Sequence, residues 1–142
     1  MRKFLILIGL LVSLTSSGQF NLSSGFTIQI SCGVTGVTSS DITNIQRLVQ
    51  SKNHASLKQS LYSFSPAEAV LSVIALQTLE SKGVITLTSE EAKRIREVSA
   101  WTDRFSICHT CSQHIDGTVN ELLAKRSGVA YQFLAAALFK ST

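Results

Sequence analysis

The residues with the greatest chemical potential lie within nine positions, from Ser106 to His114. Cys108 and Cys111 are three residues apart, and His109 and His114 stand beside and after them. Two thiols at this spacing can form a disulfide, exchange disulfides with a partner, or bind a metal ion together with imidazoles. Three chemistries are therefore open to this segment.

A structural disulfide is the favoured interpretation. A bond between Cys108 and Cys111 closes a short loop and stabilises the fold by roughly 2 kcal/mol in the chain-entropy model. A bond from Cys32 to either of them closes a long loop and contributes roughly 4.5 kcal/mol in the same model. Because the chain has three cysteines, one thiol is left free, pairs with another chain or binds metal. Both pairings stay open.

Thiol–disulfide exchange is the second interpretation. We expect a helix to begin near Cys111, and the dipole at a helix N-terminus favours a thiolate. A protonated His109 acts in the same direction. A thioredoxin fold is excluded, because the only proline, Pro66, precedes the cysteine pair and no βαβ pattern follows it.

A zinc site is the third interpretation. Cys108, Cys111 and His114 stand at positions i, i+3 and i+6, and Cys32 or His109 would complete four ligands. Strong zinc signatures contain two separated ligand pairs, whereas this chain has one, so we expect no cofactor and keep zinc as the alternative. Covalent haem is excluded because a serine, and not a histidine, follows the second cysteine.

Other enzyme signatures are absent from the sequence. The chain has no Gly-x-Ser-x-Gly elbow, no His-Glu-x-x-His pair and no glycine-rich phosphate loop, so we expect a protein without enzymatic activity. The formal net charge is +4, and basic residues cluster only at positions 93–96 and 125–126. Because a nucleic-acid binder usually has a concentrated basic face, no nucleic-acid partner is expected.

The first eighteen residues have the pattern of a cleaved leader. Residues 2 and 3 are basic, residues 4–14 are almost entirely apolar, and small residues at 16–18 precede Gln19. This segment resembles a bacterial export signal. The apolar run is shorter than the roughly 20 residues that span a bilayer, and no second span follows. We therefore expect a signal peptide over 1–18 and an exported protein, periplasmic or extracellular, with no stable membrane span.

The remainder divides into an extended arm over 19–38 and a single helical domain over 39–142. In the arm, Phe26, Ile28, Ile30 and Cys32 alternate with polar residues, which predicts a short strand. We expect this arm to lie on the helical body or to be partly disordered, or else to add to a sheet edge of another molecule. Six helices are predicted after it, over about 41–50, 53–64, 66–82, 89–103, 111–126 and 129–140. The predicted fold class is all-α, a compact bundle or short helical array preceded by the arm.

The helix that follows Ser65 carries the strongest local signals. Ser65 is a capping residue, Glu68 is placed to reach back to its amide, and Gly83 can end the helix in a left-handed conformation. Its apolar residues cover most of its circumference, which predicts a helix buried at the centre of the domain.

The leading functional hypothesis is an exported, non-enzymatic module that binds another protein or assists an envelope process. The first alternative is a thiol-redox or metal-binding protein that uses the Cys108-x-x-Cys111 pair. The second is an inhibitor or toxin-neutralising partner.

Overall fold

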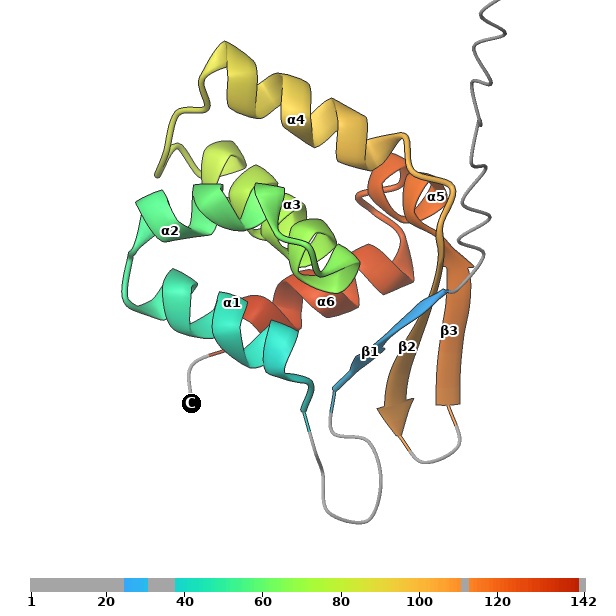
Figure 1. Ribbon diagram of the computed structural model, residues 1–142. Helices are drawn as coiled ribbons and strands as arrows, with labels where there is room; N and C mark the ends of the chain where they lie inside the picture. Colours follow the sequence, from blue (N-terminus) through green and yellow to red (C-terminus); the bar gives the residue numbers. More distant parts are fainter. Residues whose placement is uncertain (1–24, 31–37, 111–112, 141–142) are drawn as a thin grey trace, which may run out of the picture.

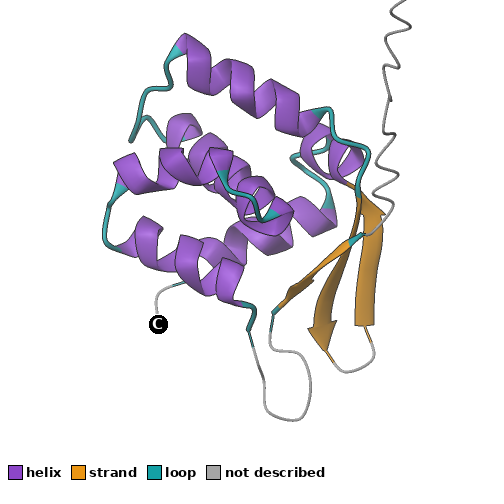
Figure 2. Ribbon diagram, viewed as in Figure 1, coloured by secondary structure: helices purple, strands orange, loops and turns teal. Residues whose placement is uncertain are grey.

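The computed structural model describes residues 25–30, 38–110 and 113–140, and the structural statements below concern these residues. Helices form one side of the molecule, and a three-stranded sheet forms the other (Figures 1 and 2). The fold is therefore α+β, and the predicted all-α class is wrong. The predicted leader lies outside the described residues.

Ten elements follow one another along the chain. They are β1 (Phe26–Gln29), α1 (Ser40–Gln50), α2 (His54–Gln59), the 3₁₀ helix η1 (Ser60–Tyr62), α3 (Pro66–Ser81), α4 (Ser89–Ser99), β2 (Arg104–Thr110), β3 (Gln113–Thr118), α5 (Val119–Ala124) and α6 (Val129–Phe139). None of the described helices has both the length and the apolar character needed to cross a membrane.

Helix α3 is the centre of the helical layer, as its sequence predicts. Eleven of its sixteen residues are buried, and it contacts α1, α2, α4, α6 and β1 (Figure 1). The Oγ of Ser65 accepts a hydrogen bond from the amide of Glu68 at 3.3 Å. Beyond the helix, Gly83 has a φ of 67°, a conformation that glycine adopts without steric cost. The predicted boundaries are confirmed.

The carboxylate of Glu68, however, does not cap the helix as predicted. It accepts hydrogen bonds from Nδ2 of Asn44 at 2.7 Å, from Oγ of Ser60 at 3.0 Å and from Oγ of Ser63 at 2.6 Å. The amide of Ser65 donates to the Oγ of Ser63 instead. The carboxylate therefore joins α1, η1 and the start of α3.

The sheet has the strand order β1-β2-β3. β1 runs parallel to β2, with Ile28 opposite Ile107. β2 runs antiparallel to β3, with Phe105 opposite Gly117 and Ile107 opposite Ile115. Ile28, Phe105 and Ile107 are buried in the common core with the helices. The strand predicted in the arm is thus confirmed over 26–29, and it pairs with β2 of its own chain.

The error in fold class arises after position 103. Within the helix predicted over 111–126, Gln113–Thr118 form strand β3, and the chain becomes helical only at Val119. Ile115, Val119 and Leu122 stand at the spacing of one helical face. Ile115 nevertheless lies on β3, and only Val119 and Leu122 lie on α5, which follows it directly. A strand that leads into a short helix can therefore imitate a longer helix in the sequence.

Candidate functional site

The described residues between Ser106 and His114 lie on two antiparallel strands and not at the start of a helix. Cys108 is buried on β2, and His114 lies directly opposite it on β3. Among the described residues the next helix, α5, begins only at Val119 and not near Cys111, so the helix-dipole part of the redox hypothesis is wrong. Cys111 lies outside the described residues, as does the side chain of His109.

Neither of the two predicted disulfide pairings lies within the described residues. Cys108 is the only cysteine among the described residues, so no disulfide joins two of them. Cys32 and Cys111, the two predicted partners of Cys108, lie outside the described residues.

The described residues contain no group of three or more His, Cys, Asp and Glu side chains that could hold a metal ion. Of the predicted zinc ligands, the fold brings Cys108 and His114 together, while Cys32 and Cys111 are not described. The zinc site stays a prediction.

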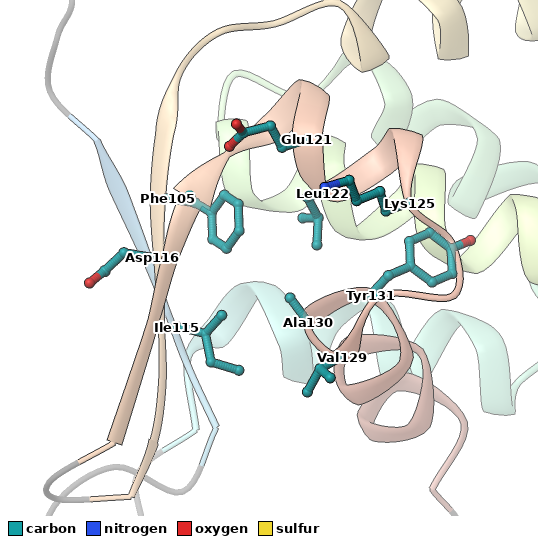
Figure 3. Close-up of a pocket in the computed structure, with 11 residues that line it drawn as sticks. Phe105, Ile115, Asp116, Glu121, Leu122, Lys125, Val129, Ala130 and Tyr131 are labelled. Carbon is teal, nitrogen blue, oxygen red and sulfur yellow. The ribbon is translucent and has the colours of Figure 1, made fainter.

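An open apolar pocket of about 170 Å³ lies between the inner face of the sheet, α5 and the start of α6 (Figure 3). Phe105, Ile115, Leu122, Val129 and Ala130 surround the space in Figure 3. Two glycines in the lining contribute no side chain and help to keep it open. A cavity of about 150 Å³ with a comparable lining accommodates benzene. The pocket is therefore large enough for one apolar side chain.

The ring of Phe105 determines which residue can stand at position 117. A Cβ atom built on Gly117 would lie 3.2 Å from two carbons of this ring, which is closer than ordinary packing allows. Because the two residues are directly opposite each other, the ring covers the glycine. It thereby forms one wall of the pocket.

The rim of the pocket carries one acidic and one basic side chain, Glu121 and Lys125. The carboxylate of Glu121 accepts hydrogen bonds from the hydroxyl of Thr118 at 2.8 Å and from its amide at 3.3 Å. These hydrogen bonds lower the pKa of Glu121. The side chain of Asp116 points away from the pocket, on the other face of the sheet (Figure 3). The mouth is thus polar, and the interior is apolar.

Tyr131 lines the pocket at the side of α6, and its hydroxyl points away from the open space (Figure 3). This hydroxyl donates a hydrogen bond to Oε1 of Gln77 at 3.2 Å. Burial raises the pKa of Tyr131, and the Thr78 hydroxyl and the Arg126 charge offset this only in part. The phenol is therefore held in its neutral form.

β3 is an edge strand of the sheet within the described residues. The amide of Ile30 donates to the carbonyl of Cys108, so the backbone groups of Cys108 face β1. Backbone groups alternate in direction along a strand, and the register therefore turns those of Ile115 toward β2. By the same alternation, the backbone groups of His114 and Asp116 face outward and lack a strand partner.

The pocket was not predicted from the sequence. Val129, one of its lining residues, is 79% exposed and carries no signal of a binding site in the sequence. The lining comes from β2, β3, α5 and α6, which only the tertiary fold brings together. Comparison of the chain with protein families, characterised proteins and solved structures finds no significant match.

Proposed function

We propose that this protein is a binding module for an extended segment of another protein, which adds as a strand to the outer edge of β3. The observation that carries this proposal is the position of the apolar pocket directly beside that edge. An added strand would pair with the outward backbone groups of His114 and Asp116. Main-chain hydrogen bonds then supply affinity, and a pocket for alternate side chains supplies specificity.

The geometry supports one apolar anchor in the bound segment. A strand added to β3 lies about 4.8 Å from it, and every second side chain points to the helical side of the sheet. On that side, Ile115, Val129 and Ala130 form the wall of the pocket. The proposed ligand is therefore an extended peptide with a leucine-sized or phenyl side chain, flanked by residues that tolerate the charged rim.

Selection of random nine-residue peptides on phage against the purified protein tests this proposal. We expect enriched peptides to share one large apolar residue. Asp116→Pro removes an outward amide without touching the ladder to β2, and proline is tolerated on edge strands. It should abolish binding, whereas Asp116→Ala keeps the amide and should bind like the wild type.

Ala130→Phe provides an independent test, because it fills the pocket and leaves the edge intact. It should also abolish binding of the selected peptides, measured by isothermal titration calorimetry. Failure to enrich any peptide would overturn the proposal. So would peptides that bind both Asp116→Pro and Ala130→Phe as tightly as the wild type.

We further propose that the protein acts outside the cytoplasm, on the basis of residues 1–18. N-terminal sequencing of the protein recovered from its host should begin at Gln19. Recovery of the intact chain from the cytosol would contradict this location. An inhibitory or toxin-neutralising role would be a special case of the proposed binding, with the partner's activity lost when its segment is bound.

A further inference from the structure

A second cleft, of about 320 Å³, lies where α3, α4 and α5 meet. Leu87, Ala92, Ile95 and Leu123 give it an apolar lining, and Gln77, Glu80, Arg96, Ser99 and Arg126 give it polar groups. Contacts between α3 and α4 and between α4 and α5 hold its walls together (Figure 1). The cleft shares no lining residue with the pocket beside β3.

The two arginines of the cleft make no ion pair within the described part of the chain. The neighbouring Arg94, in contrast, is paired with Glu97 at 3.3 Å and also donates to the carbonyl of Leu61. Glu80, the acidic residue in the lining, likewise has no ion pair among the described residues. The lining therefore carries two unpaired guanidinium groups, from Arg96 and Arg126, against one carboxylate.

Gln77 supplies a hydrogen-bond donor in the lining of this cleft. Its side chain is 6% exposed, and its Oε1 accepts the hydrogen bond from Tyr131. Its Nε2 has no hydrogen-bond partner among the described residues. This atom is not fully enclosed by protein, since Ser39 Oγ is the only fully enclosed side-chain polar atom without a partner in the described part of the chain. Because Gln77 lines the cleft, this amide group is available to a ligand there. A ligand acceptor can therefore take the place of water at this donor.

We propose that the cleft binds the carboxylate group of a ligand with a short apolar body. Guanidinium groups recognise carboxylates through paired hydrogen bonds, and the Gln77 amide adds a neutral donor. The apolar lining accommodates a small aliphatic chain, while Glu80 disfavours a doubly charged anion such as phosphate. A free carboxylic acid and the C-terminal residue of a peptide share this chemistry. The inference does not depend on strand addition at β3.

Matched pairs of probes test the proposal by calorimetry on the whole protein. They are 4-methylpentanoate against 4-methylpentanamide, and acetyl-Gly-Gly-Leu against its C-terminal amide. We expect at least one acid to bind roughly tenfold more tightly than its amide, since a charge-assisted hydrogen bond is about twice as strong as a neutral one. Binding of the peptide alone identifies a C-terminus as the ligand, and binding of the small acid identifies a free acid.

Exposed arginines allow variants that leave the core unchanged. Arg96→Gln and Arg126→Gln should each weaken acid binding about tenfold, and bound acid should shift the NMR signals of the Gln77 side-chain amide. Arg104→Gln is the control, because Arg104 lies on β2 outside this cleft and should leave affinity unchanged. Equal binding of acids and amides, tighter binding of inorganic phosphate, or full affinity in both cleft variants would overturn the proposal.

Discussion

The carboxylate of Glu68 offers the sharpest test of how the helical layer is held together. It accepts hydrogen bonds from Asn44, Ser60 and Ser63 at 2.7, 3.0 and 2.6 Å. These donors come from α1, from η1 and from the link into α3. Glu68→Ala removes the shared acceptor and leaves three donors to find new partners.

The magnitude follows from the number and type of these bonds. Hydrogen bonds to a charged group contribute about 1.5–3 kcal/mol each, but three that share one partly exposed carboxylate do not add, so we expect a loss of about 3 kcal/mol for Glu68→Ala. Glu68→Gln keeps one acceptor oxygen, and serine hydroxyls can turn to accept from its new amide group. The expected loss for this variant is about 1 kcal/mol.

Urea unfolding monitored by circular dichroism measures both losses. An unchanged slope of the unfolding free energy against urea concentration would show that the variants expose the same surface on unfolding. Glu90→Ala is the matched control, because Glu90 also lies in the first turn of a helix, is exposed and has no hydrogen bond among the described residues. It should lose only the helix-dipole interaction, about 0.5 kcal/mol. A Glu68→Ala protein as stable as Glu90→Ala would refute the reasoning.

Three further outcomes are expected. Leu76→Asp should prevent folding, because Leu76 is fully buried in α3 and the new carboxylate would have no partner; a wild-type melting curve would contradict the placement of that helix. Gly117→Val should destabilise the sheet by about 1–3 kcal/mol through its clash with Phe105, and Phe105→Ala in the same chain should relieve part of the clash in a double-mutant cycle. Burial tends to raise the pKa of Glu91, but hydrogen bonds from Thr88 and the charge of Lys58 outweigh it and lower that pKa below 4.5. The unfolded carboxyl therefore binds its proton first as pH falls, and stability should decrease below about pH 4.5, less steeply in Glu91→Gln.

Local signals in the sequence determined what could be predicted of the helical layer. Ser65 and Gly83 mark the two ends of α3, and the apolar circumference between them can be buried only at the centre of the domain. Each of these signals depends only on residues close together in the chain, so it can be recognised from the sequence alone. The same holds for the capping box of Thr88 and Glu91 at the start of α4.

The sheet depends on information that is not local. Phe105 and Ile107 alternate with polar residues, as strand residues do, but the helical spacing from Ile115 onward favoured a helix. The parallel partner of β2 is β1, near the other end of the described chain. The pocket and the cleft could not be predicted, since each is bounded by residues from at least three elements.

The parallel pairing of β1 with β2 has a consequence for how the chain acquires its structure. Parallel neighbours require a long crossover, and here the crossover contains α1, α2, η1, α3 and α4. During synthesis β1 leaves the ribosome first, and its strand edge stays unpaired until residues 104–107 have been made. Unpaired strand edges invite association with other chains. Rapid formation of the intervening helices shortens the time for which β1 is unpaired. Mutations that slow their formation should increase aggregation before they reduce the stability of the finished fold.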